Sequence, residues 1–241
     1  MEEFLKENYS LLTHVFEAIA AITGLLLFKK YKFTVVKYFI YFLVYLTICD
    51  LANQYNRYVH PDMFLSFLVG TVFKKNFWWC TLYWDIGAIL FFVFYFNRIL
   101  KKESFKKIIS ISGLVFFVFS IGCIIINWDD FFIKFFTSIV VFGALIIILC
   151  CMFYFVEILQ SDKVLTFYKS MNFYITTGIF IWWLIITPIV FYDVYYVYDS
   201  LKNIYIDWDF TMLRQQIYLF SNILMYSTFT FALIWCRPQN D

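Results

Sequence analysis

Charged residues are scarce in this chain of 241 residues: they make up 15% of it, whereas 63% of the residues are hydrophobic. A soluble domain has about 25% charged residues, which cover the surface that it exposes to water. So little polar surface excludes a water-exposed globule and indicates a protein with several membrane-spanning helices. The net charge of +2 and the lack of a basic stripe also argue against nucleic acid as a partner.

Histidine is scarcer still, with only His14 and His60 in the chain. Seven-helix, zinc-dependent lipid hydrolases of the alkaline ceramidase type need about three histidines besides Asp and Ser, so their ligand set is lacking. The six cysteines lie within or at the edge of apolar runs, without a CxxC spacing, and are expected to be small apolar helix residues. No GxSxG, HExxH, P-loop or GxGxxG motif occurs. We therefore expect neither a metal nor a cofactor.

Lysine is absent from the last apolar run, Met212 to Trp235. The layout of apolar runs resembles that of rhodopsins and receptors, but a retinal protein needs a lysine in this run to form the Schiff base. The layout is also similar to small sugar transporters with a three-plus-one-plus-three arrangement. Those have prolines in equivalent helices of both halves, and here only Pro188 lies inside a run. These resemblances concern topology alone, which does not define a function.

What the sequence has in abundance is long apolar runs. A lipid-spanning helix needs about 20 mostly apolar residues. Seven runs qualify, at about residues 10–28, 34–54, 77–97, 108–127, 131–159, 172–196 and 212–235. We therefore predict an all-α membrane protein, with one seven-transmembrane helix bundle over residues 1–241. The start of the chain lacks the positive region of a secretory signal, so the first run is expected to remain as a helix. A shorter apolar segment, at about residues 63–73, is predicted to be interfacial or re-entrant.

The positive residues in the connections predict the orientation of the bundle. With the N-terminus outside, twelve of the 19 Lys and Arg residues lie on the inner side and seven on the outer side. The first two inner connections are short and rich in lysine, where this rule is strongest. We predict an outside N-terminus and an inside C-terminus, in a multi-pass protein of the cell membrane whose first partner is the lipid bilayer.

Three carboxylates lie within the apolar runs. At 1.5 Å per residue, Glu17 lies about 10 Å below the outer surface, Asp50 about 6 Å and Asp85 about 12 Å. A charge in the hydrocarbon region is costly unless it is paired, so these residues are expected to face the bundle interior or a water-filled cavity, and they are candidates for function. The same level of the bundle collects other polar side chains, namely Arg57, Asp193, Arg214 and Asn222.

Two interpretations of these polar residues remain open. In the first, they line a polar cavity that opens to the outside and binds an unknown small ligand. In the second, they form buried pairs that fix helix packing, such as Asp50 with Arg57 and Glu17 with His14. Both pairs have helical spacing, so the sequence does not decide between the two.

Two further features concern packing. Ala20 and Gly24 are small residues four apart, which permits close helix approach in lipid and directs Glu17 into a helix–helix contact. Pro188, in the stretch WWLIITP, is expected to kink its helix. A kink beside a cavity could serve as a hinge between two states, although prolines are common in membrane helices.

These observations favour a non-enzymatic, receptor-like sensor or accessory protein with an outward-facing polar cavity, which would need a membrane protein partner to relay a signal. One alternative is an intramembrane lipid-processing enzyme that uses the carboxylates as acid and base. Another is a small-solute or proton-coupled transporter. The sequence does not name the ligand.

Overall fold

The computed structural model describes residues 2–161, 166–196 and 208–238, and within these ranges it contains helices and no strands. Seven segments are long and apolar enough to cross a membrane, which confirms the predicted seven-helix bundle. They are Asn8–Leu26, Val36–Tyr58, Phe77–Ile99, Glu103–Ile126, Thr137–Leu159, Met171–Asp193 and Asp209–Trp235. The chain is therefore a multi-pass membrane protein. Its orientation stays a prediction, and Lys163 and Lys202, which enter the charge count, lie outside the described residues.

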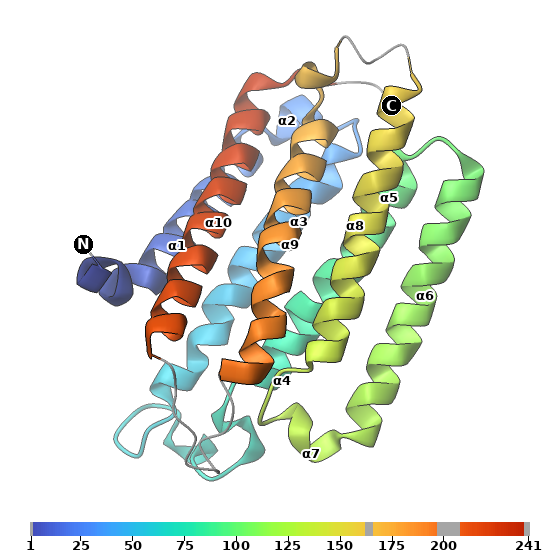
Figure 1. Cartoon of the computed structure of the whole chain (residues 1–241). Helices are drawn as coiled ribbons and strands as arrows, with labels where there is room; N and C mark the ends of the chain where they lie inside the picture. The colour runs from blue at the N-terminus through green and yellow to red at the C-terminus, as the bar shows by residue number, and fades with distance from the viewer. Residues whose placement is uncertain (1, 162–165, 197–207, 239–241) are drawn as a thin grey trace.

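The helices alternate in direction between the two ends of the bundle (Figure 1). The long helices are α1 (Glu2–Leu26), α3 (Val36–Asn53), α5 (Ile89–Ile99), α6 (Glu103–Ile126), α8 (Thr137–Leu159), α9 (Met171–Tyr196) and α10 (Trp208–Trp235). The short ones are α2 (Phe28–Tyr31), η1 (Gln54–Tyr58), η2 (Ser66–Leu68), η3 (Val72–Lys74), α4 (Phe77–Cys80), η4 (Thr81–Ala88), α7 (Trp128–Phe131) and η6 (Phe167–Lys169). We name the end of the bundle that carries η1, η2, η3 and α7 the outer end, after the predicted orientation.

The packing order differs from the chain order. The last helix, α10, packs between α1 and α9, while α3 lies on another side of α1. Helix α9 also packs on α8, and α8 contacts both α5 and α6. Gly24 permits the close approach of α1 to α3, because a Cβ atom there would lie 3.1 Å from Cγ2 of Ile40. The predicted small-residue contact of the first helix is thus confirmed.

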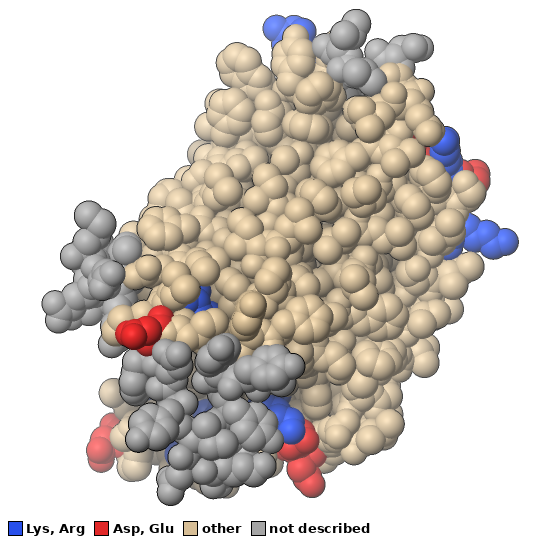
Figure 2. All heavy atoms as spheres, viewed as in Figure 1, with Lys and Arg blue, Asp and Glu red and all other residues tan. Residues whose placement is uncertain are grey.

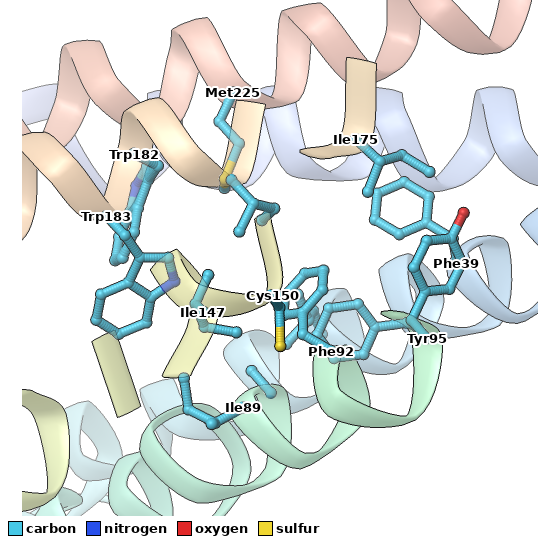
Figure 3. Close-up of a cluster of buried hydrophobic side chains, with 14 of the residues drawn as sticks. Phe39, Ile89, Phe92, Tyr95, Ile147, Cys150, Ile175, Trp182, Trp183 and Met225 are labelled. Atoms are coloured by element: carbon cyan, nitrogen blue, oxygen red, sulfur yellow. The ribbon is translucent and has the colours of Figure 1, made fainter. Parts of the chain in front are cut away.

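The centre of the bundle is apolar and tightly packed (Figure 3). Phe39, Phe92, Tyr95, Ile147 and Cys150 come from α3, α5 and α8, and each is at most 2% exposed. All six cysteines are free thiols, and Cys150 packs within this cluster. Charged side chains gather toward the two ends on the face shown in Figure 2, and the wide band between them is mostly uncharged. That distribution suits a bundle whose flanks face hydrocarbon.

Two segments differ from the sequence prediction. The fifth span begins at Thr137 and not at residue 131, because the chain turns after α7, where Lys134 Nζ lies 2.9 Å from the Asp130 carboxylate. The 63–73 segment forms the separate 3₁₀ turns η2 and η3 and no continuous helix. Gly70, between them, has a φ of +86°, and this left-handed conformation ends the helical path.

The inner end of α10 is held by α2. The Tyr31 hydroxyl lies 2.9 Å from the carbonyl oxygen of Leu233 and 3.0 Å from that of Cys236. Lys30 Nζ donates at 3.0 Å to the carbonyl oxygens of Leu233 and Ile234. These donors satisfy carbonyl groups that a helix C-terminus leaves without partners. Burial raises the pKa of the Tyr31 phenol and lowers the pKa of the Lys30 ammonium.

Candidate functional site

The third span contains an eight-residue π-helix, η4 (Thr81–Ala88). Such wide turns are rare and often occur at functional sites. On a regular α-helix, residues two apart point to nearly opposite sides, yet Tyr83 and Asp85 are both 5% exposed. Gly87 leaves room for this geometry, because a Cβ atom there would lie 3.0 Å from the Leu82 carbonyl oxygen. Thr81, Ile86 and Ala88 of the same π-helix are buried as well, so this segment is covered on more than one side and both polar side chains lie inside the bundle.

Glu17 of α1, which is buried, and Asp50 of α3, which is half-buried, form an acidic pair. Glu17 is 1% exposed, and neither of its carboxyl oxygens has a hydrogen-bond partner or surface that water can reach. Asp50 is the ionisable neighbour that acts most strongly on Glu17, and the Thr47 hydroxyl also lies beside it. Two carboxyl groups that face each other in a low-dielectric interior cannot both be ionised at low cost. The pair therefore needs a proton or another positive charge.

The groups around the acidic pair supply a donor to Asp50 but none to Glu17. The Tyr83 hydroxyl donates a hydrogen bond to Oδ1 of Asp50. The Thr47 hydroxyl donates to the Leu43 carbonyl oxygen at 2.9 Å, so only its lone pairs are left for Glu17. No donor thus forms a hydrogen bond with either carboxyl oxygen of Glu17, and a ligand that completes the site must donate hydrogen bonds or carry positive charge.

The other titratable groups that face the acidic pair are neutral ones. Cys49 lies beside both acids on α3, and Tyr226 of α10, 4% exposed, faces them from the opposite helix. Among the ionisable groups that act on Glu17 within the described ranges, there is no lysine or arginine. Within the described residues, no basic side chain is therefore among the groups that would offset a negative charge on Glu17.

A second polar cluster joins α9 to α10 at the outer end. Nε of Arg214 lies 2.7 Å from Oδ1 and 2.9 Å from Oδ2 of Asp193. The Arg214 guanidinium also lies 5.1 Å from the centre of the Tyr218 ring. Asp85 is among the charged groups that act on Tyr218, so the third predicted carboxylate borders this cluster. Its Oδ2 oxygen is buried without a hydrogen-bond partner.

The remaining predicted residues occupy separate positions. Asn222 accepts a hydrogen bond of 2.7 Å from Trp182, about two turns further along α10 than Arg214. Pro188 lies inside α9, which continues through it from Met171 to Tyr196. Thr187 donates to the Trp183 carbonyl oxygen at 2.6 Å just before the proline. A hinge at Pro188 stays a prediction.

The two local pairs of the structural interpretation are wrong. Arg57 is exposed in η1, and no ion pair between it and Asp50 occurs in the described part of the chain. His14 shares a hydrogen bond with Gln54, whereas the Glu17 oxygens have no partner. Helical spacing fails as a guide because a side chain on the neighbouring helix is closer than one on the same helix. Tyr83, Thr47 and Tyr226 complete the site, and the sequence analysis did not single them out.

A pocket opens at the inner end of the bundle, away from the acidic pair. It is lined by Ile99, Lys101, Tyr154, Glu157, Ile158, Ser161, Thr166, Phe167, Ser170 and Asn172. The Glu157 carboxylate is already engaged there, since it accepts hydrogen bonds from the backbone N–H groups of Lys101 and Lys102, at 2.9 and 2.8 Å for the shortest contacts. It satisfies free donors just before α6, which is a structural role.

No family model, curated protein or solved structure matched the chain in comparisons with known proteins. No group of three or more His, Cys, Asp and Glu side chains suited to a metal ion occurs over residues 2–161, 166–196 and 208–238. Fold and composition define the class as a multi-pass, seven-helix membrane protein. Its function must be inferred from its own polar residues.

Proposed function

We propose that the protein is a non-enzymatic membrane sensor or accessory protein, and that the acidic pair Glu17–Asp50 binds a small positively charged ligand. One observation carries this proposal: Glu17 is buried, both of its carboxyl oxygens lack partners, and a second carboxyl group faces it. A proton is the smallest ligand that removes the repulsion within the pair. A sodium ion or a small ammonium ion would meet the same need.

The enclosure of the site supports a small ligand. Because the Glu17 oxygens present no surface that water can reach, a larger molecule would have to separate α1 from α3. These helices are closely packed at Gly24. A proton or a bare monovalent ion requires the smallest rearrangement, and a change in helix packing on binding would be the signal.

Binding is favoured over transport by the core of the bundle. Phe39, Phe92, Tyr95 and Cys150 fill the apolar centre of the bundle (Figure 3). A carrier needs a path that opens alternately to the two sides, whereas a sensor needs only a change in helix packing. Enzymatic acid–base chemistry needs a reacting atom of the substrate beside the acids. Since water does not reach the Glu17 oxygens, a lipid substrate has less room there than a proton or a small ion.

The experiment is a cation titration on the purified protein in detergent micelles. The thermal unfolding midpoint would be measured in sodium, potassium, methylammonium and choline chloride at constant ionic strength. We expect at least one small cation to raise the midpoint relative to bulky choline. At a hundred times its dissociation constant, a ligand stabilises the native state by about 2.7 kcal/mol. The control is Asp130→Asn, which removes a surface carboxylate that is 42% exposed.

The cation response should vanish in Glu17→Gln and persist in Asp130→Asn. Gln keeps the shape of Glu17 and brings its own donor to Asp50, so the variant is expected to fold. An equal response in Glu17→Gln would contradict the assignment of the ligand to the acidic pair. The unfolding midpoint would also be measured at several pH values. If neither the cations nor the pH change this midpoint, the sensor proposal fails.

A sensor of this kind also needs a membrane protein partner that reads the packing change. Purification from the native membrane in a mild detergent, with and without Glu17→Gln, tests this part of the proposal. We expect the same partner in stoichiometric amount with both forms, because Glu17 is buried away from the lipid-facing surface. Recovery of the chain alone under several mild detergents would contradict a stable partner.

A further inference from the structure

The connection between the second and third spans, residues 59–76, exposes apolar side chains outside the spans. The second span ends at Tyr58 and the third begins at Phe77. Phe64 is 87% exposed and Phe67 is 70% exposed. Other large apolar side chains of this connection are also exposed, namely Met63, Val69, Val72 and Phe73. Such a density of exposed apolar groups marks an interaction surface.

The backbone of this connection pairs several of its N–H groups within the connection itself. Six N–H groups bond to carbonyl oxygens three residues earlier, at 3.0 to 3.2 Å. The donor–acceptor pairs are Met63–His60, Ser66–Met63, Leu68–Leu65, Val69–Ser66, Thr71–Leu68 and Lys74–Thr71. The Thr71 hydroxyl also donates to the Leu68 carbonyl oxygen, at 2.8 Å. Each internal pair lowers the cost of placing that part of the backbone in a low-dielectric environment.

The fold imposes the exposure of these side chains. The Tyr55 hydroxyl accepts a hydrogen bond of 2.9 Å from Trp78 and lies 2.7 Å from the carbonyl oxygens of Phe73 and Lys75. The Leu65 N–H group donates to the Tyr58 carbonyl oxygen at 3.1 Å. These bonds tie both ends of the apolar part to the spans, so Phe64 and Phe67 cannot fold inward without breaking them.

Polar residues flank the apolar part on both sides. His60 and Asp62 precede it, while Lys74 and Lys75 follow it, and all four are exposed. Apolar side chains between charged ones, with lysines close to a span, are typical of segments at the boundary between headgroups and acyl chains. Lys75 lies next to the third span, with its ammonium 5.5 Å from the centre of the Phe77 ring.

We infer that residues 63–73 insert into the headgroup–acyl boundary of the membrane that the bundle spans, and that the partner of this surface is lipid. Phe64 and Phe67 enter the acyl region, and Lys74 and Lys75 meet phosphate groups. Lipid is favoured over a protein partner because the apolar part lies between two membrane spans and is followed by two exposed lysines. The inference is independent of the acidic pair.

Photocrosslinking tests this inference on the full chain in vesicles of phosphatidylcholine and phosphatidylglycerol. Benzoylphenylalanine would replace Phe64 in one variant, Phe67 in a second and His60 in a control. Because Phe64 and Phe67 are so exposed, the larger ring is expected to leave the fold unchanged. After irradiation, intact-mass spectrometry separates phospholipid adducts from protein–protein products and unreacted chain.

We expect phospholipid adducts to dominate at positions 64 and 67 and to be severalfold rarer at position 60. Protein–protein products in place of lipid adducts at 64 and 67 would overturn the inference in favour of a protein interface. Mostly unreacted chain at both positions would also overturn it, because the side chains would then face water. Similar lipid yields at all three positions would contradict the selective insertion of the apolar part.

Discussion

The hydroxyl of Tyr83 donates a hydrogen bond to the carboxylate of Asp50, and this contact joins the π-helix η4 to α3. Glu17, the other acid of the pair, accepts no hydrogen bond at either carboxyl oxygen. One acid of the pair is therefore anchored by the protein, while the other depends on whatever occupies the site. The asymmetry assigns different roles to two carboxyl groups that look alike in the sequence.

The Tyr83–Asp50 bond is expected to contribute to stability. Tyr83→Phe keeps the ring but removes the donor, which should cost about 1–2 kcal/mol of unfolding free energy because a half-buried carboxylate is left without its partner. Titration with sodium dodecyl sulfate would measure this. In a double-mutant cycle with Asp50→Asn, a coupling of about 1 kcal/mol is expected. Tyr41→Phe, at an exposed position, is the control, and additive effects would contradict a direct bond.

The Asp193–Arg214 ion pair should matter more than an exposed pair. Its side chains are 20% and 30% exposed, against 42% and 60% for Asp130 and Lys134. Arg214→Gln should cost about 1–2 kcal/mol, since the remaining charge is partly buried. Lys134→Gln should cost about 0.5 kcal/mol or less. Both would be measured by the same detergent titration, and equal losses would show that burial does not distinguish them.

The thiol of Cys236 should react slowly at neutral pH. Burial raises the pKa of this thiol to about 11, and the nearby Lys30 ammonium acts in the opposite direction. At pH 8 its thiolate fraction is therefore about two orders of magnitude below that of a free cysteine. Alkylation, followed by peptide mass spectrometry, should accelerate about tenfold per pH unit toward pH 11, because deprotonation limits the rate.

Lys30→Met provides the second measurement on Cys236. Loss of the ammonium removes a charge that favours the thiolate, so alkylation at a given pH should become slower still. A rate that levels off near pH 9 in the wild type would contradict the raised pKa. Faster alkylation in Lys30→Met would show that Lys30 acts mainly by holding α10 closed.

The sequence predicts the number of spans well because hydrocarbon imposes a length and composition on every crossing helix. The same reasoning places Glu17, Asp50 and Asp85 in one half of the bundle. It does not tell which partners they meet, because that depends on rotation about each helix axis and on packing order. Helix α10 inserts between α1 and α9, and nothing in the linear order of the helices specifies that arrangement.

The sites that the sequence analysis missed have local physical causes. Tyr83 and Asp85 are both buried in the π-helix η4, and the TLYWDIGA stretch carries no established signal for such a helix. The 63–73 segment is apolar enough for a helix, but Gly70 adopts a left-handed conformation and divides it. The pairing of His14 with Gln54 rather than Glu17 reflects the contact between α1 and the end of α3.

The most direct test of the central claim is infrared spectroscopy of carboxyl groups in the purified protein at neutral pH. A protonated carboxyl group absorbs apart from a carboxylate, so the spectrum shows whether the Glu17–Asp50 pair holds a proton. We predict a protonated-carboxyl band that is lost in Glu17→Gln, retained in Asp130→Asn, and reduced when a stabilising cation is added. A wild-type spectrum without that band, or a band unchanged by Glu17→Gln, would contradict the account.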